Sequence, residues 1–306
     1  MLKFTSKLFY ISFFFRMERW TGRVALVTGA SVGIGATVCE ALVRSGLKVV
    51  GAARGVDQVK ALSESLKDAK GSLLPIKCDL TKENDVLNLF EKIKEEFGGV
   101  DICINNAGLS NGKKLLEGTV EEMREMTDVN IIALCLCSQL AIKSMRERGV
   151  DDGHIINISS ISGHAVFPLS SRFYAATKFA VRAITEGLRQ EMRELGSHIR
   201  ISSVSPGMVE TQFAFRAFKD EEKAKNLYRS CEPLKPEDIS SSILHIISSP
   251  AHIEFDRALT RNLRSNFTIV KYIKTLTLSS KLMILFYDRR TSYNKINNLK
   301  PSFVII

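Results

Sequence analysis

The stretch Arg23-Val24-Ala25-Leu26-Val27-Thr28-Gly29-Ala30-Ser31-Val32-Gly33-Ile34-Gly35 decides the fold. Its first five residues form a short run typical of a buried strand, and an apolar helical pattern follows from residue 36 to residue 44. Gly29 permits a tight turn, and Gly33 and Gly35 allow the backbone to approach a pyrophosphate at the start of the helix. A glycine-rich turn between a strand and a helix therefore predicts a dinucleotide-binding α/β unit.

The residue after the second predicted strand indicates which dinucleotide binds. Residues 47–53 read as that strand, and Arg54 follows it, 19 positions beyond Gly35. NAD-binding proteins place an acidic residue about 20 positions on, where it binds the ribose 2′-hydroxyl. A guanidinium at this place suits a 2′-phosphate instead. Arg54 therefore favours NADP(H) over NAD, and the alternative is a solvated surface arginine.

Strands and helices then alternate. Residues 73–78, 100–104, 155–158 and 199–204 read as buried strands, and residues 82–97 and 120–148 read as helices. Polar or small residues follow the strands, where they can contact a bound dinucleotide. Asp79-Leu80 is expected to contact the adenine ring, and residues 105–108 are expected to form a turn that holds the cofactor ribose. Pro206-Gly207 is expected to form a turn against the nicotinamide. The pattern predicts a single α/β domain with a doubly wound parallel sheet and helices on both faces.

A second motif, Tyr174-Ala175-Ala176-Thr177-Lys178, opens another apolar helical run. Tyr174 and Lys178 lie on one helix face, one turn apart. A free tyrosine has a pKa of about 10, and a neighbouring ammonium lowers that pKa because it favours the phenolate. Ser160 follows a strand and is expected at the same rim of the sheet. The group predicts acid/base catalysis; the alternative is a packed ring beside a solvated charge.

Two further features each allow two interpretations. Asn130 lies among apolar residues and must be hydrogen-bonded, either to hold a bend or to bind a water for proton relay. The aromatic residues after the last predicted strand form either plain core or one wall of an apolar substrate pocket. They are Phe213, Phe215, Phe218 and Tyr228, with Leu227 among them.

The distribution of charge argues against nucleic-acid binding. The chain has 306 residues and a formal net charge of +10. Residues 256–306 hold ten Lys/Arg against two acidic residues and residues 1–20 hold four against one, which leaves −1 for residues 21–255. A basic stripe interleaved with aromatic residues is absent from that central segment. The hydrophobic fraction of 45% is that of an ordinary globular protein.

The six cysteines indicate a reducing compartment. None forms a C-x-x-C pair and most lie in apolar runs, so we expect small buried hydrophobic residues, no metal site and a cytoplasmic protein. They are Cys39, Cys78, Cys103, Cys135, Cys137 and Cys231.

The first 16 residues resemble part of a signal peptide. Two lysines precede the apolar run 8–15, but Arg16-Met17-Glu18-Arg19 follows where a small-residue cleavage site would be expected. The run is also too short to cross a bilayer as a helix. We expect residues 1–16 to be a leader outside the fold, either non-native or weakly membrane-touching, without stable membrane insertion.

With these pieces in place, the chain resembles the short-chain dehydrogenase/reductases. The single-domain branch of that family carries T-G-x3-G-x-G, N-N-A-G and Y-x-x-x-K in this order, as this chain does at residues 28–35, 105–108 and 174–178. Stretches at 17–20, 150–157 and 206–215 look closest to a subgroup of farnesol dehydrogenases and keto-steroid reductases. The resemblance implies a Rossmann-type sheet of about seven strands and a homodimer or homotetramer.

The resemblance also implies a role for each matching residue. Tyr174 is the acid/base, Lys178 lowers its pKa and binds the nicotinamide ribose, Ser160 polarises the carbonyl, and Asn130 anchors a relay water. Substrate contacts are implied for Ser160 and Tyr174. Cofactor contacts are implied for Tyr174 and Lys178 and for Gly29, Ala30, Ser31, Val32, Gly33, Ile34, Gly35, Arg54, Asp79, Leu80, Asn106, Val209, Glu210, Thr211 and Gln212.

The implied activity is NADP(H)-dependent hydride transfer to or from a small apolar alcohol, ketone or aldehyde. A farnesol-like isoprenoid or a steroid would be such a substrate.

One departure from the family pattern concerns the C-terminus. The family has a short final strand of Gly-Asp-Ile type after the position of Phe255, whereas residues 256–306 contain no glycine. We interpret this segment as read-through of non-coding sequence, and a genuine basic extension is the alternative. The expected organisation is therefore a leader at 1–16, a catalytic domain at 17–255 and a basic tail at 256–306, with one sheet edge left open. A second hypothesis follows: an NADPH-binding but catalytically weak protein with a disrupted C-terminus.

Overall fold

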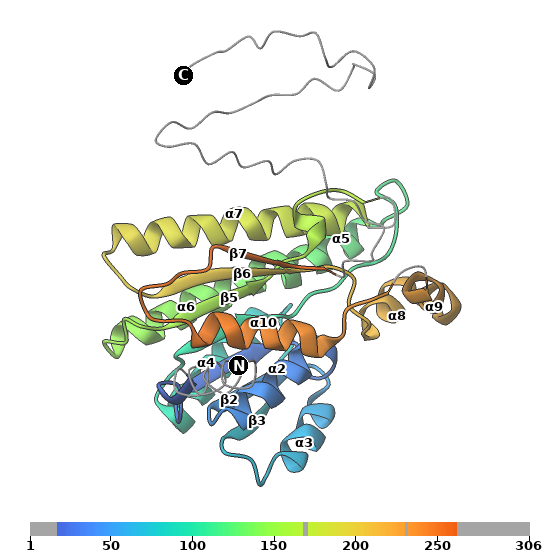
Figure 1. The fold of residues 1–306 in the computed structure, drawn as a ribbon. Helices are drawn as coiled ribbons and strands as arrows, with labels where there is room; N and C mark the ends of the chain where they lie inside the picture. Colours follow the sequence, from blue (N-terminus) through green and yellow to red (C-terminus); the bar gives the residue numbers. More distant parts are fainter. Residues whose placement is uncertain (1–16, 168–170, 230–231, 262–306) are drawn as a thin grey trace, which may run out of the picture. The chain divides into compact units, whose positions relative to one another are not determined.

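A computed structural model describes residues 17–167, 171–229 and 232–261, and in these residues seven parallel strands form one sheet (Figure 1). The leader at 1–16 and most of the expected tail lie outside the described residues. The strands are β1 (Val24–Thr28), β2 (Lys48–Ala53), β3 (Ser72–Lys77), β4 (Ile102–Asn105), β5 (His154–Ile158), β6 (Arg200–Pro206) and β7 (Arg257–Thr260).

Helices connect the strands. They are α2 (Gly33–Arg44), α3 (Val56–Ser65), α4 (Glu83–Phe97), α5 (Val120–Thr127), α6 (Ala133–Glu147), α7 (Arg172–Glu194), α8 (Gln212–Phe218), α9 (Glu221–Arg229) and α10 (Pro236–Ser248). A π-helical segment, η1 (Asp128–Ile132), joins α5 to α6, and a short 3₁₀ turn, η2 (Ile161–Gly163), follows β5.

The strand order β3-β2-β1-β4-β5-β6-β7 confirms the doubly wound sheet. Strand order reverses beside β1, which pairs with β2 on one side and with β4 on the other. In open parallel sheets ligands bind outside the carboxyl ends of the strands at this reversal. The turn that follows β1 therefore occupies the position expected for a bound ligand.

Both faces of the sheet are buried, which explains the apolar strand sequences. Side chains of β1 alternate: Val24 and Leu26 pack in the core with α4 and α6, whereas Ala25 and Val27 pack in the core with α2 and α10. Figure 1 shows α10 beside α2, and α7 on the other side of β6 and β7 from α10. The two cores leave the carboxyl ends of the strands for polar residues.

A buried polar network crosses the sheet beneath those carboxyl ends. Asn105 of β4 donates from Nδ2 to Asn157 Oδ1 of β5 at 2.8 Å and to Ser138 Oγ of α6 at 2.8 Å. Asn157 in turn donates from Nδ2 to Thr185 Oγ1 of α7 at 3.0 Å. All four side chains are buried, so each polar atom must find its partner inside the protein. The network connects two central strands to α6 and α7.

The long helix expected at 120–148 is present but is not uniform. Its π-helical segment, η1, contains Asn130. The whole run Val120–Glu147 is long and apolar enough, by length and composition, to cross a membrane, and 44% of the most apolar window is buried in the protein. Core helices pass the same test, and Met126, Cys137 and Met145 are buried here.

The sheet does not end at β6, so the expected open edge and the expected domain boundary at Phe255 are wrong. β7 pairs with β6 in parallel register, from Ser203 with Arg257 to Pro206 with Thr260. Main-chain hydrogen bonds to β6 define this strand, so it does not require the Gly-Asp-Ile sequence of the family pattern. The folded domain extends at least to Thr260.

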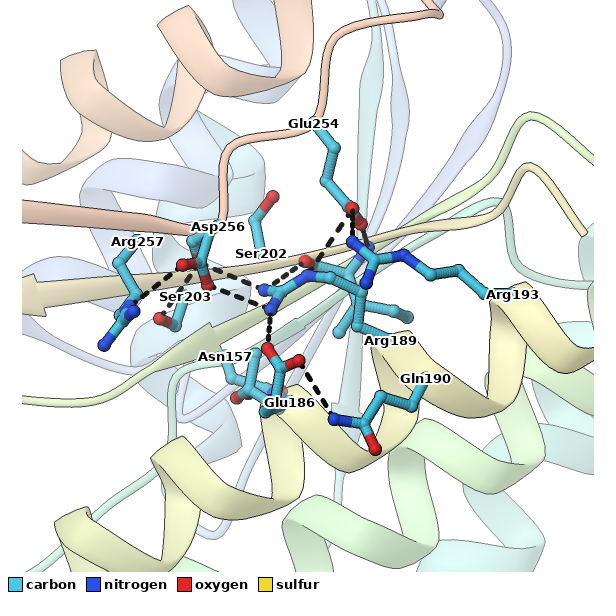
Figure 2. Close-up of polar contacts among 12 residues, drawn as sticks. Asn157, Glu186, Arg189, Gln190, Arg193, Ser202, Ser203, Glu254, Asp256 and Arg257 are labelled. Atoms are coloured by element: carbon cyan, nitrogen blue, oxygen red, sulfur yellow. Dashed lines mark hydrogen bonds and ion pairs between the residues drawn. The ribbon is translucent and has the colours of Figure 1, made fainter. Parts of the chain in front are cut away.

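A charge cluster around Arg189 holds the start of β7 against α7 (Figure 2). The Arg189 side chain is 4% exposed, and its Nη1 lies 2.9 Å from Asp256 Oδ1 and pairs closely with Glu186. Its Nε lies 3.5 Å from Glu254 Oε2, and its Nη2 donates to the carbonyl oxygen of Ile201 at 3.0 Å and to that of Asp256 at 3.2 Å. One buried guanidinium thus joins α7, β6 and the residues just before β7.

The prediction that the cysteines are buried is confirmed for most of the described thiols. Cys39, Cys78, Cys103 and Cys137 are free and buried, whereas Cys135 is part-buried. Cys231 lies outside the described residues.

Candidate active site

The glycine turn between β1 and α2 has the backbone geometry that only glycine supplies easily. Gly29 and Gly33 have φ of +68° and +58°. A Cβ added to Gly35 would lie 2.2 Å from the Gly29 carbonyl oxygen. No side chain caps the N-terminus of α2, whose first amides are therefore available to an anion. The turn residues Ala30, Ser31, Val32 and Ile34 complete this predicted phosphate cradle.

Asn106 holds the glycine turn from the end of β4. Its Nδ2 donates to the carbonyl oxygens of Thr28 at 2.8 Å and Gly29 at 3.3 Å. In return, Thr28 Oγ1 accepts from the amides of Asn106 and Ala107, both at 3.1 Å. A Cβ on Gly29 would lie 2.9 Å from Ala107 Cα, so the two segments touch. Asn106 is thus a structural partner of the predicted phosphate cradle.

Arg54 and Asp79 lie close together after β2 and β3. The Arg54 side chain is 62% exposed and its Nη1 lies 3.8 Å from Glu125 Oε1 of α5. Burial raises the pKa of Asp79, but hydrogen bonds from Thr81 and the positive charge of Arg54 outweigh it, and the pKa is lowered. Leu80 packs at the edge of the neighbouring core. The exposed guanidinium is free to meet an anion beside the glycine turn.

Tyr174, Lys178 and Ser160 lie together, as predicted. α7 begins at Arg172, and Ser171 caps it by accepting from the Tyr174 amide at 3.5 Å. The Lys178 side chain is 3% exposed; its Nζ donates to the Ile158 carbonyl oxygen at 2.8 Å and lies 5.7 Å from the centre of the Tyr174 ring. The end of β5 and the start of α7 therefore share one rim of the sheet.

The acidity of Tyr174 differs from the expectation. Burial raises the pKa of Tyr174 to about 12, and a hydrogen bond with Ser160 offsets only part of that effect. Burial also lowers the pKa of Lys178 to about 8. Loss of hydration is the largest effect on both groups, so the net lowering of the Tyr174 pKa that we expect from Lys178 is not found in this structure. The phenol keeps its proton at neutral pH.

Asn130 is buried beside Lys178. Its side chain exchanges two hydrogen bonds with the main chain of Leu109, both at 2.9 Å, and donates to Thr177 Oγ1 at 3.0 Å. A Cβ on Gly108 would lie 3.5 Å from both Asn130 Oδ1 and Lys178 Nζ. The Asn130 amide therefore links the loop after β4 to α7. These three hydrogen bonds provide the partners that a buried amide requires.

The segment after β6 folds back over the glycine turn. A Cβ on Gly33 would lie 3.1 Å from Thr211 Cβ, so Thr211 faces the turn directly. Tyr228 of α9 donates from its hydroxyl to the Thr211 carbonyl oxygen at 2.8 Å. Val209 and Glu210 are held by main-chain pairing with Leu234. The predicted cofactor residues at 209–212 thus lie opposite the predicted phosphate cradle, and Gln212 starts α8.

Some aromatic residues of α8 and α9 form core, and one is placed as a wall of an apolar pocket would be. Phe215, Phe218 and Tyr228 pack in a small core of their own with Ala214, Ala224 and Leu227. Phe213 instead lies over Tyr174, with ring centres 5.5 Å apart, and remains 38% exposed. One aromatic residue therefore forms an apolar wall beside the Tyr174 phenol, and the others support the helix that carries Phe213.

Sequence reasoning missed the residues that fasten the site. Thr28, Ser171 and Thr177 each bind a predicted site residue or its neighbour through a short polar side chain. Thr28 has one signal in the sequence, its position directly before Gly29. The partners of Thr177 and His164 are distant in sequence, and no local pattern reveals them.

Comparisons with known proteins agree with this geometry. Residues 23–222 match the family model described as short chain dehydrogenase. Dehydrogenase/reductase SDR family member 11 of Homo sapiens is 54% identical over 242 residues, which cover 78% of this chain and 93% of that protein. Farnesol dehydrogenase of Aedes aegypti is 43% identical over 241 residues, which cover 78% of this chain and 95% of that protein.

A solved structure shows the same likeness. The closed form of serine dehydrogenase complexed with NADP⁺ has a TM-score of 0.70 to this chain at 29% identity, covering 78% of this chain and 94% of its own. The motifs, the sheet order and these similarities lead to one conclusion: the chain belongs to the short-chain dehydrogenase/reductase family, whose members are oxidoreductases that bind nicotinamide cofactors.

Proposed function

We propose that the protein is an NADP(H)-dependent alcohol dehydrogenase/carbonyl reductase that acts on apolar alcohols, ketones or aldehydes. The observation that carries the proposal is the grouping of Ser160, Tyr174 and Lys178 beside Phe213. The loop Ala107-Gly108 contacts both Lys178 and the glycine turn, so it connects this group to the predicted phosphate cradle. Polar groups suited to a carbonyl oxygen thus adjoin an apolar wall. The relative named farnesol dehydrogenase supports an isoprenoid alcohol or aldehyde as one substrate class. We propose steroids as a second class to test.

The residues present fit a dinucleotide. Gly29 and Gly35 leave no space for a Cβ, so the backbone packs as closely as a phosphate cradle requires. The amides at the start of α2 would hold the phosphates, Arg54 a 2′-phosphate, and Asp79 with Leu80 the adenine end. Residues 209–212 would hold the nicotinamide end. The bound cofactor supplies or accepts the hydride.

The preference for NADP(H) is part of the proposal and rests on Arg54. Its guanidinium is exposed at the end of β2, and the ion-pair distance to Glu125 of 3.8 Å is too long for a strong bond. It can therefore turn toward a phosphate at small cost. The solved relative complexed with NADP⁺ supports the same choice.

The catalytic groups have separate tasks in the reduction. The Ser160 hydroxyl donates a hydrogen bond to the substrate carbonyl oxygen and stabilises the negative charge that develops there. Tyr174 gives its phenolic proton to that oxygen as the carbon is reduced, and the Lys178 ammonium stabilises the resulting phenolate. In the oxidation the phenolate takes the proton back. The pKa of Tyr174 lies well above neutral pH, so the phenol is protonated there, which is the form that reduction requires.

The experiment measures NADPH consumption by the purified full chain with ketones and aldehydes of increasing apolar surface, beside NADPH binding by fluorescence. Turnover that rises with apolar surface supports the proposal. Binding without turnover of any substrate favours the catalytically weak alternative, and absence of binding contradicts both.

We further propose that the protein is cytoplasmic and forms a homodimer or homotetramer. The exposure of Ile132 and Phe179, at 55% and 40%, supports the oligomer because both side chains are large and apolar. Sedimentation equilibrium of the full chain tests it, and a monomer at micromolar concentration would contradict it.

A further inference from the structure

His164 lies at the end of the turn that carries Ser160. Its Nε2 is 2.9 Å from Ser205 Oγ, a hydrogen bond between residues 41 positions apart. Ser205 is fully buried on β6, directly before Pro206. The side chain of His164 therefore joins the loop after β5 to the carboxyl end of β6.

The turn itself is short and tightly held. The Gly163 amide donates to the Ser160 carbonyl oxygen, and the His164 amide donates to that of Ile161, both at 2.9 Å. A Cβ on Gly163 would lie 2.6 Å from the Lys178 carbonyl oxygen, so the turn touches α7. Arg182 of α7 donates to the Gly163 carbonyl oxygen at 2.9 Å. Arg182 thus binds the turn to α7, and His164 binds it to β6.

His164 binds the carboxyl end of β6, and the predicted nicotinamide contacts follow this strand within a few residues. Ser205 pairs with Leu259 of β7, and the Gly207 amide donates to the Thr260 carbonyl oxygen at 2.7 Å. The segment 209–212 follows within a few residues. A displacement of β6 relative to the Ser160 turn would therefore separate the carbonyl-binding hydroxyl from the place of hydride transfer.

We propose that His164 is a positioning residue, which fixes Ser160 relative to the Pro206-Gly207 turn through its hydrogen bond to Ser205. This role rests on the proposed function, because the distance between these two elements matters for catalysis only if Ser160 binds the reacting oxygen.

The surroundings keep the imidazole neutral. Burial lowers the pKa of His164, and the positive charges of Arg182 on α7 and Arg257 on β7 lower it further. A neutral imidazole offers one donor and one acceptor, either of which can bond a hydroxyl. The hydrogen bond to Ser205 is therefore available throughout the neutral range.

The test compares three variants with the wild-type chain. His164→Leu removes the hydrogen bond and keeps an apolar side chain, His164→Gln retains a donor and an acceptor at similar reach, and Ser205→Ala removes the other partner. His198→Leu is the matched control, because His198 also has a hydrogen-bonded ring but precedes β6 at the opposite end of the strand.

We expect His164→Leu and Ser205→Ala each to lower kcat about fivefold, the effect of one neutral hydrogen bond, while the NADPH dissociation constant stays within twofold of wild type. The double variant should be no worse than either single variant, because both remove the same bond. His164→Gln should recover most of kcat, and His198→Leu should leave it unchanged. Unchanged kcat in Ser205→Ala, additive losses, or no recovery by glutamine would each overturn the proposal.

Hydrogen exchange supplies a measurement that needs no turnover. In the chain without added substrate, the amides of Ser162 and Gly163 should exchange faster in His164→Leu and Ser205→Ala, and at the wild-type rate in His164→Gln. Equal protection in all variants would overturn the link even if the enzyme is active. If the wild type turns over nothing, the proposed function fails, and the exchange data still decide whether His164 holds the turn.

Discussion

Replacement of Arg189 by methionine tests whether the charge cluster, rather than the sequence of β7, holds the last strand in place. Methionine keeps an apolar chain of similar length, so the change removes the guanidinium without opening a large cavity. The buried Arg189 Nη2 donates to the carbonyl oxygens of Ile201 and Asp256. Those bonds end with the substitution, and the two acceptors lose their buried donor.

The expected cost can be built from the contacts. The two charge-assisted hydrogen bonds share one nitrogen, so we count about 2 kcal/mol for them together. The ion pairs to Asp256, Glu254 and Glu186 involve carboxylates that are 52%, 29% and 49% exposed, so water screens them and each contributes about 0.5 kcal/mol. Arg189→Met should therefore lower the free energy of unfolding by about 3.5 kcal/mol.

Urea unfolding measures the total, and hydrogen exchange of residues 256–261 shows where the loss occurs. Arg193→Met is the control, because that guanidinium is 67% exposed and lies 3.9 Å from Glu254; it should cost less than about 0.5 kcal/mol. Burial of the Arg189 charge also has a cost. If the cost of burying the charge cancels the hydrogen bonds and ion pairs of Arg189, the two variants will have the same free energy of unfolding. That result would refute the claim that the cluster holds β7 in place.

Three further predictions concern the site. Tyr174→Phe should reduce turnover by about 10²–10⁴-fold because it removes the proton donor. The NADPH dissociation constant should stay within a few fold of wild type, because the lost hydroxyl is not a cofactor anchor. Steady-state rates above about a tenth of wild type would contradict this prediction. Arg54→Asp should shift the ratio of kcat/KM for NADPH and NADH toward NADH, since a carboxylate repels a 2′-phosphate, and an unchanged ratio would make Arg54 a surface charge only. Because burial lowers the pKa of Lys178 from 10.5 to about 8, the unfolded chain binds more protons between those pH values. The free energy of unfolding of the wild type should therefore rise by about 3 kcal/mol relative to Lys178→Met as pH increases from 8 to 10.5, and parallel pH profiles from urea titrations would count against it.

Local patterns were sufficient wherever one segment contains all the residues that define a structure. The glycine turn is one case, because the strand, the turn and the helix follow one another within residues 23–44. Tyr174 and Lys178 are another case, since the helical repeat alone puts them one turn apart. Their proximity to Ser160 needed only the rule that strand ends and helix starts share a rim of the sheet.

The sequence was insufficient where a partner distant in the chain decides the outcome. β7 pairs with the edge of β6, and Arg189 forms an ion pair with Asp256 just before the strand. The sequence Arg257–Thr260 alone reveals neither contact. The acidity of Tyr174 depends on how deeply Phe213 and the surrounding loops bury it, which residue spacing does not reveal. The π-helical form of residues 128–132 likewise accompanies the contacts of Asn130 with Leu109 and Thr177.

The buried network of Asn105, Asn157, Ser138 and Thr185 has a consequence for the position of α7. Apolar helix faces can slide over a sheet by small steps at little cost, whereas a buried amide has a few discrete partners and loses 1–3 kcal/mol when it has none. Thr185 lies on the same stripe of α7 as Lys178, two turns further along. A shift of α7 along the sheet would leave the Asn157 amide without its partner Thr185, so the network favours one position of the helix that carries Tyr174 and Lys178. We therefore expect substitutions in the surrounding core to change the free energy of unfolding more than they change the position of Tyr174.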